Sequence, residues 1–139
     1  APACSIEFYQ KHYEKRLKTK AGAKSKLPIL DIYNLNEKLE LDDNVVSAYQ
    51  KSLLYLVSRA LEREIDKPLL GMQLHTKRLS APGLTINYSD GKKKGNKDVT
   101  TSTSHGGFDN DVTTMNAIMQ RILGKEPAAP FTKEEMKGY

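Results

Sequence analysis

The organisation of this chain centres on one stretch, Ser102-Thr103-Ser104-His105-Gly106-Gly107-Phe108-Asp109-Asn110-Asp111, which leads directly into the apolar-periodic segment Val112 to Leu123. Here an imidazole, two adjacent glycines and several carboxylates and hydroxyls precede a helical pattern. Glycines permit sharp turns and close approach of the backbone, and an imidazole is the side chain best suited to proton transfer near neutral pH. The stretch therefore predicts a functional loop followed by a helix. Asp111 or Asp109 is expected to cap that helix and Gly124 to end it.

Within this last helix, the expected buried face is Met115, Ile118, Met119, Ile122 and Leu123. Two further helices are expected upstream. The first, Ser5 to Lys20, has apolar residues at helical spacing with lysines opposite, and the second runs from a capping box at Ser47 and Gln50 to the region before Pro68.

Two segments have the composition of strands. Leu27 to Tyr33 is short, apolar and β-branched, as a buried strand is, and Leu84 to Tyr88 alternates apolar and polar residues. Val99 to Thr103 is expected to pair with the latter in a hairpin, whereas Asn34 to Asp43 reads as a polar, acidic connection. Alternating helices and strands predict an α/β fold in which helices pack on a small, mostly parallel sheet.

This order of elements suggests three regions. Residues 1–26 form a basic helix and linker, residues 27–124 the α/β core, and residues 125–139 an extended tail with one short helical turn. The chain of 139 residues, with 38% hydrophobic and 28% charged residues, has the composition of a soluble globular domain. No apolar run approaches the roughly 18 residues of a membrane span. The compartment stays open, and a start at Ala1 without Met fits a processed, secreted product as well as other origins.

His105 is the leading candidate for catalysis, as a general base or acid. Asp42 and Asp43, in an acidic block with Glu40, could supply the carboxylate that orients the ring, as the acid of a catalytic triad does. The simpler interpretation is that these carboxylates cap the following helix. Likewise, His105 could be a surface residue beside a turn.

No cofactor or metal is expected. Asp109 and Asp111 carry oxygen ligands that suit a hard cation, but the remaining ligands of a calcium loop are missing and helix capping explains Asp111. The single cysteine, Cys4, excludes an internal disulfide and a cysteine-built zinc site. It is expected to be chemically inert.

The order of segments resembles the final part of an α/β-hydrolase, in which an acid follows one late strand, a histidine follows the last strand and a helix closes the fold. Tyr33-Asn34-Leu35, the segment Ser52 to Ala60, and Ser104-His105-Gly106-Gly107-Phe108-Asp109 resemble late segments of bacterial lipase-like or esterase-like proteins. The resemblance implies ester hydrolysis, with His105 as base and Asp42 or Asp43 as acid. The Gly-x-Ser-x-Gly motif of the nucleophile is absent, so a second chain or a missing N-terminal region would carry the serine.

Two other functions stay open. The net charge of +5 and the lysine groups around Lys11 to Lys26 and Lys92 to Lys97 would suit a small toxin-like nuclease or a nucleic-acid-binding domain. Solvated faces are the more frequent explanation of such lysines. The third possible function is that of a non-catalytic interaction module, which would leave the loop that carries His105 unexplained.

Overall fold

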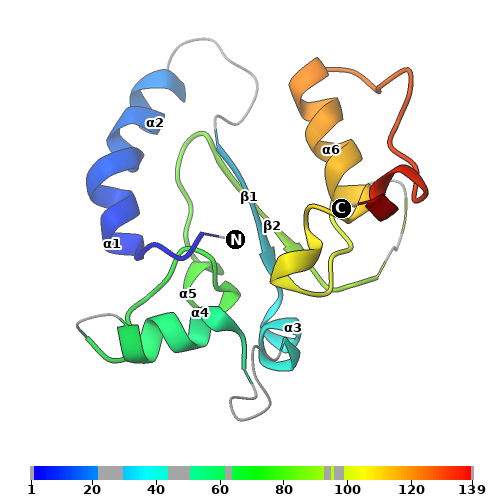
Figure 1. Ribbon diagram of the computed structural model, residues 1–139. Coiled ribbons are helices and arrows are strands. Elements are labelled where there is room, and N and C mark those ends of the chain that lie inside the picture. The colour runs from blue at the N-terminus through cyan, green and yellow to red at the C-terminus, as the bar shows by residue number, and fades with distance from the viewer. Residues whose placement is uncertain are drawn as a thin grey trace.

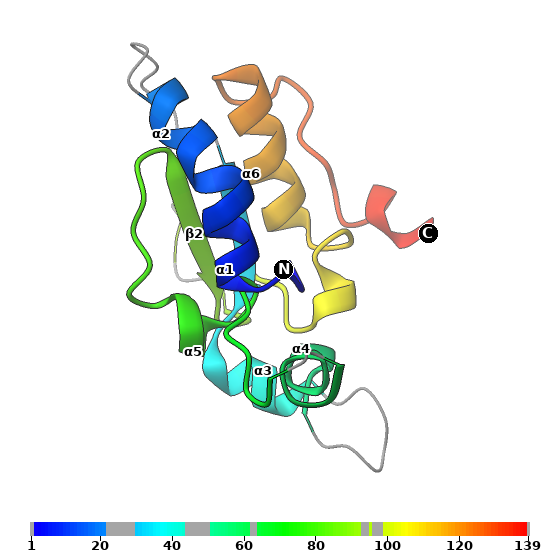
Figure 2. The same ribbon diagram turned by 90° about the vertical axis from the view of Figure 1, so that its left-hand side faces the viewer.

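The computed structural model describes residues 2–21, 30–43, 51–61, 64–92, 95 and 99–138. Its centre is a two-stranded parallel sheet of β1 (Leu30–Leu35) and β2 (Leu84–Ser89), in register from Leu30 opposite Leu84 to Leu35 opposite Ser89. Helices lie on both sides of this sheet (Figures 1 and 2). The expected α/β class with a small parallel sheet is therefore confirmed.

The N-terminal helix runs continuously through α1 (Ile6–Tyr9), a π-helical segment (Gln10–Glu14) and α2 (Lys15–Ala21). Ser5 begins it, because its hydroxyl accepts the backbone N–H of Phe8 at 3.2 Å. Tyr9 and Leu17 are buried on one face of this helix and pack with Ile32 of β1 and with Leu70. The helix predicted from apolar spacing is thus confirmed, and it is part of the main core.

The expected hairpin is wrong. It would pair Leu84–Tyr88 with Val99–Thr103, but the partner of β2 is β1 and residues 99–103 are not a strand. The polar groups of this segment are used elsewhere. The backbone N–H of Thr101 donates to Asp111, and the carbonyl of Ser102 accepts the hydroxyl of Ser89. These bonds replace the ladder that a hairpin would need.

The connection after β1 contains a helix that the sequence analysis did not predict, α3 (Glu37–Asp42). Asn36 caps it, since its side-chain oxygen accepts the N–H of Leu39 at 2.9 Å. The next helix, α4 (Leu53–Leu56), continues into a π-helical segment (Val57–Leu61) and begins at Ser52. The predicted capping box at Ser47 and Gln50 lies outside the described residues.

The segment after this helix is a second contributor to the core. Leu69 and Met72 are buried with Leu54 and Tyr55 of α4, and α5 (Gln73–Thr76) follows immediately. Leu70, in between, belongs to the cluster around the N-terminal helix. This short segment thus connects the two apolar clusters of the described core.

The predicted last helix is α6 (Val112–Leu123), and its ends are as expected. Asp111 caps its start and Gly124 ends it with a left-handed φ of 67°. None of the five residues of its predicted buried face is fully buried. Met115, Ile118 and Met119 are partly buried, Ile122 is 79% exposed and Leu123 is 49% exposed, whereas the buried residue of α6 is Thr114. A single 3₁₀ turn (Glu135–Gly138) follows in the otherwise extended tail, as predicted.

Candidate functional site

The candidate site lies where the two parallel strands end. β1 leads into α3, which carries Glu40, and the chain after β2 leads to a 3₁₀ turn (His105–Gly107). Parallel strands end at the same edge of a sheet, and in open α/β sheets ligands bind outside that edge. The sequence resemblance also expected an acid and a histidine after successive strands. The structure brings such a pair together.

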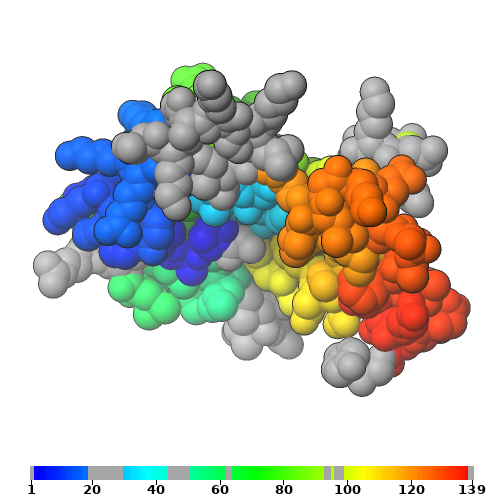
Figure 3. All heavy atoms as spheres, turned by 90° about the horizontal axis from the view of Figure 1, so that it is seen from above, coloured from blue at the N-terminus to red at the C-terminus, as the bar shows by residue number. Residues whose placement is uncertain are grey.

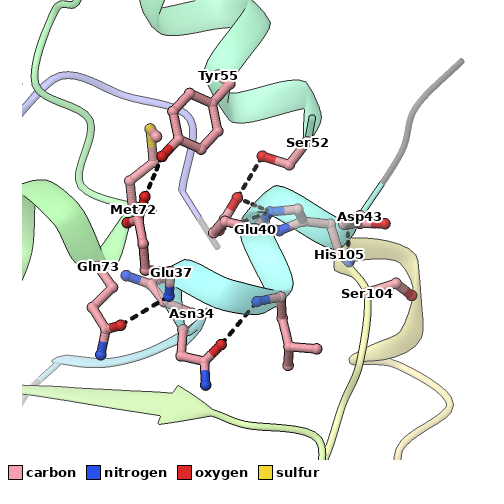
Figure 4. Close-up of polar contacts among 12 residues, drawn as sticks. Asn34, Glu37, Glu40, Asp43, Ser52, Tyr55, Met72, Gln73, Ser104 and His105 are labelled. Atoms are coloured by element: carbon pink, nitrogen blue, oxygen red, sulfur yellow. Dashed lines mark hydrogen bonds and ion pairs between the residues drawn. The ribbon is translucent and has the colours of Figure 1, made fainter. Parts of the chain in front are cut away.

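Glu40 and His105 are in direct contact. Nε2 of His105 lies 3.0 Å from each of the two carboxylate oxygens of Glu40 (Figure 4). The Glu40 side chain is fully buried, and the His105 side chain is 21% exposed. A buried carboxylate needs a positively charged or hydrogen-bonding partner to offset its lost hydration, and the imidazole supplies one.

Ser52 completes the contacts of this carboxylate. Its hydroxyl donates to Oε2 of Glu40, so this oxygen accepts from both Ser52 and the histidine. Oε1 of Glu40 has no hydrogen-bond partner although it is buried. Ser52 also occupies the N-cap position of α4 but makes no side-chain cap bond there, because its hydroxyl is turned to Glu40 instead.

Neither of the sequence-predicted acids, Asp42 and Asp43, forms a described hydrogen bond with the ring of His105. Asp43 accepts the backbone N–H of His105 at 2.9 Å, which holds the main chain of the histidine loop against the end of α3. Asp42 is exposed at the end of α3. Where the sequence analysis placed Asp42 or Asp43 at the ring, the structure places Glu40.

Glu40 belonged to the acidic block identified in the sequence but was not chosen from it. Glu40 could have been chosen only if α3 had been predicted. In this helix, which Asn36 caps, Glu37 and Glu40 are three residues apart and share a face. Both are acceptors for hydroxyls of the next helix, since Ser52 donates to Glu40 and Tyr55 donates to Glu37. Ser52 itself carried no local signal of a site.

A polar network holds α3 in place. The N–H of Glu37 donates to Oε1 of Gln73 on α5 at 2.8 Å, and Asn34 of β1 donates to the carbonyl of Leu70 at 3.0 Å. Burial, then the hydrogen bond and the charge of Glu37, raise the pKa of Tyr55, so its hydroxyl remains a donor at physiological pH. α3 is thereby fixed to β1, α4 and α5, and Glu40 with it.

The histidine loop, residues 102–110, is closed at its base by Asp111. This carboxylate accepts the N–H of Thr101 at 2.7 Å and its hydroxyl at 2.5 Å, and also the N–H and hydroxyl of Thr114 at 3.1 and 2.5 Å. Burial raises the pKa of Asp111, but these hydrogen bonds outweigh it and hold the pKa below its ordinary value. One side chain thus joins the segment before the loop to the helix after it.

The two glycines of the loop differ in what they permit. Neither has a positive φ, since the glycines in that region are Gly83, Gly91 and Gly124. A Cβ on Gly107 would lie 2.9 Å from Oγ of Ser102, whereas a Cβ on Gly106 would meet no atom within 4 Å. Of these two positions, only position 107 requires glycine, because a side chain there would lie too close to Ser102.

The sequence also raised the questions of a metal site, of Cys4, of the lysine run and of a membrane span. Across the described ranges, no group of three or more His, Cys, Asp or Glu side chains is placed to hold a metal ion. Burial raises the pKa of the Cys4 thiol, which disfavours the reactive thiolate. Much of the lysine run from Lys92 to Lys97 lies outside the described residues. None of the helices in the described part of the chain has the length and apolar character needed to cross a bilayer.

Comparisons of this chain with protein-family models, with curated proteins and with solved structures gave no match.

Proposed function

We propose that this chain supplies the histidine and acid of an ester-hydrolysing active site of the α/β-hydrolase type, with the serine nucleophile contributed by polypeptide outside it. The observation that carries the proposal is the contact of His105 Nε2 with the fully buried carboxylate of Glu40 at 3.0 Å. A buried carboxylate beside an imidazole fixes the orientation of the ring.

Glu40 uses one ring nitrogen and leaves the other available for proton transfer. Within the described residues, Nδ1 of His105 has no hydrogen-bond partner. The available nitrogen can accept the proton of a serine hydroxyl as its oxygen attacks the ester carbonyl. It then returns this proton to the leaving alcohol, which breaks the ester bond and leaves the acyl group on the serine. The same nitrogen then takes a proton from water, whose oxygen attacks the acyl group, and returns that proton to the serine oxygen as the acid leaves.

Ser52 is not the proposed nucleophile, despite its place in the site. Its hydroxyl is buried and donates to Glu40, and Glu40 lies between it and the imidazole. A nucleophilic serine must donate its hydroxyl proton to the base, and its oxygen must be exposed to the substrate. Ser52 instead stabilises the acid. Asp43, through the backbone of His105, positions the loop.

The test is ester hydrolysis by the complete native protein, purified with any polypeptide that accompanies this chain. His105→Ala should lower kcat/KM for a p-nitrophenyl ester by about 10³-fold or more, and Glu40→Gln by about 10²-fold or more. His12→Ala is the matched control, because His12 is exposed on the N-terminal helix. Ester turnover that persists unchanged in His105→Ala would reject the proposal.

A second readout identifies the serine that reacts. A fluorophosphonate probe labels an activated serine, and labelling of the companion polypeptide should slow in parallel with hydrolysis in His105→Ala. Ser52→Ala should leave the labelled peptide unchanged, because Ser52 is not expected to react. Probe attached to Ser52 itself would contradict the assignment of the nucleophile.

A further inference from the structure

The two faces of the sheet differ in chemistry. One face joins the apolar cluster around the N-terminal helix through Leu30, Ile32, Leu84 and Ile86. Successive strand residues point to opposite faces of a sheet, so the residues between these four point to the other face. They form two pairs in register, Asp31 opposite Thr85 and Tyr33 opposite Asn87. The second face of the sheet is therefore polar.

The helix α6 lies over this polar face, and its atoms lie beside those of β1 in Figure 3. An ion pair fixes it there, because Nε of Arg121 lies 2.5 Å from Oδ2 of Asp31. A cavity between α6 and the sheet is lined, on the helix side, by Ala117, Gln120, Arg121 and Gly124. These positions share one side of a helix. The side of α6 that faces the sheet is thus small and polar, whereas a helix usually packs through its apolar residues.

This cavity has the size of a small-molecule site. Its volume is about 370 Å³, and sites for small ligands have about 300–1,000 Å³. The four polar residues of the sheet form its floor, and Val99 lines it from the segment before the histidine loop. Among the described residues, none of the histidine loop, 102–110, lines it. The cavity is therefore separate from the site around His105.

Several polar groups in this cavity have no protein partner within the described part of the chain. They are the hydroxyls of Tyr33 and Thr85 and the side-chain amide of Gln120. Asn87 donates to the carbonyl of Ile32 at the long distance of 3.4 Å, and its amide oxygen accepts no described hydrogen bond. Polar groups enclosed between two layers are costly unless they are hydrogen-bonded. The cavity thus offers both donors and acceptors to a ligand.

The charges in the cavity favour an uncharged ligand. Within the described ranges, its charged side chains are Asp31 and Arg121, which pair with each other and are 18% and 25% exposed. A charged ligand would have to break this ion pair or remain unpaired itself, and both are costly in an enclosed space. Burial, then the charge of Asp31, raise the pKa of Tyr33 against a smaller effect of Arg121, so its hydroxyl keeps its proton.

The placement of the polar groups distinguishes between kinds of uncharged ligand. Tyr33 and Thr85 reach the cavity from the sheet, and Gln120 reaches it from the helix. A flat heterocycle carries its donors and acceptors in one plane, so it cannot bond to both walls while it lies between them. A sugar ring carries hydroxyls in several directions, and each of them both donates and accepts. Its C–H groups suit the apolar side chains of Val99 and Ala117.

We infer that the cavity between α6 and the polar face of the sheet binds a neutral monosaccharide. The sheet supplies the hydroxyls of Tyr33 and Thr85 and the amide of Asn87, and α6 supplies the amide of Gln120. The sugar hydroxyls satisfy these groups, and the ion pair of Asp31 with Arg121 stays intact. This binding site goes beyond the proposed ester hydrolysis and does not depend on it.

The test is saturation-transfer NMR on the complete native protein, with any polypeptide that accompanies this chain. The method detects a bound sugar through the protons of the sugar itself. The probes are glucose, galactose, mannose and N-acetylglucosamine, each titrated to about 50 mM, because a ligand held by a few hydrogen bonds binds in about the millimolar range. At least one sugar should give a saturable signal. No saturable signal from any of them would overturn the inference, and so would equal or tighter binding of the 6-phosphate of the sugar that binds.

Two conservative variants locate the bound sugar. Tyr33→Phe and Thr85→Val each remove one hydroxyl from the cavity and keep the shape of the side chain, and each should weaken binding by about 3- to 10-fold. Thr103→Val is the matched control, because Thr103 is exposed and does not line the cavity, and it should bind as the wild type does. Circular dichroism checks that each variant is folded, and either cavity variant is sufficient. Wild-type affinity in the folded cavity variants, or an equal loss in Thr103→Val, would overturn the site.

Discussion

Asp111 offers the most direct test of how the histidine loop is held. The perturbation is Asp111→Ala, which removes an acceptor of four hydrogen bonds, two from Thr101 and two from Thr114. Loss of a helix N-cap alone costs about 0.5–2 kcal/mol, and a hydrogen bond to a charged group contributes about 1.5–3 kcal/mol. Because the four bonds share one carboxylate and are not additive, we expect a total loss of about 3–4 kcal/mol. Asp111→Asn keeps one acceptor oxygen and should lose about 1–2 kcal/mol.

The assay is urea unfolding followed by circular dichroism, with Asp109→Ala as the matched control. Asp109 is exposed in the same loop, so its removal should change stability by less than about 0.5 kcal/mol. Equal stabilities of Asp111→Ala and Asp109→Ala would refute the assignment of Asp111 as the clamp of the loop.

The pH dependence gives an independent check. The folded pKa of Asp111 is below its ordinary value of 3.8, so the unfolded chain binds the proton first as the pH falls. Its contribution to stability is complete above that ordinary value and is lost as the pH falls through the lower, folded value. The stability difference between wild type and Asp111→Asn should therefore be constant near neutral pH and shrink below about pH 4. A difference that grows on acidification would contradict the reasoning.

Three further predictions follow from local contacts. Gly71→Ala should cost about 3 kcal/mol in urea unfolding, because the new Cβ would lie 2.5 Å from the carbonyl oxygen of Pro2. Gly106→Ala, in open space, should change stability by less than about 0.5 kcal/mol, and a similar cost for both would reject the packing argument. His75 accepts the N–H of Leu69 through Nδ1 at 3.0 Å, and burial lowers its pKa from 6.5. The folded chain should therefore lose stability as the pH falls below 6.5, and His75→Asn, which retains an acceptor, should reduce that slope in unfolding experiments from pH 7 to 5.

Much of the local structure could be read from the sequence because its causes lie within a few residues. Ser5 accepts from Phe8, and Asp111 accepts from Thr114, each three residues later. Gly124 ends α6 because a left-handed backbone suits glycine. α3 was missed because its cap, Asn36, lay within a segment so polar that it resembled a loop.

Pairing between distant segments was decided by the tertiary structure. Val99 to Thr103 has the composition of a strand, but its polar groups bond to Asp111 and Ser89, and β2 pairs instead with β1. β-Propensity records how well a side chain fits a pleated surface and does not identify the neighbouring strand.

The sequence by itself determined that a histidine loop would precede a capped helix, and that an acidic block would follow the first strand. Only the tertiary structure decided that Glu40, 65 residues from His105, contacts the ring while Asp43 contacts the backbone of the same residue. The physical reason is that Asp42 lies two residues after Glu40, about 200° further around the helix. Asp43 is the C-cap of α3, and its backbone, with φ −81° and ψ 80°, has left the helical conformation. Which of them meets the imidazole depends on how α3 is fixed to β1, α4 and α5, and those contacts come from residues far apart in the chain.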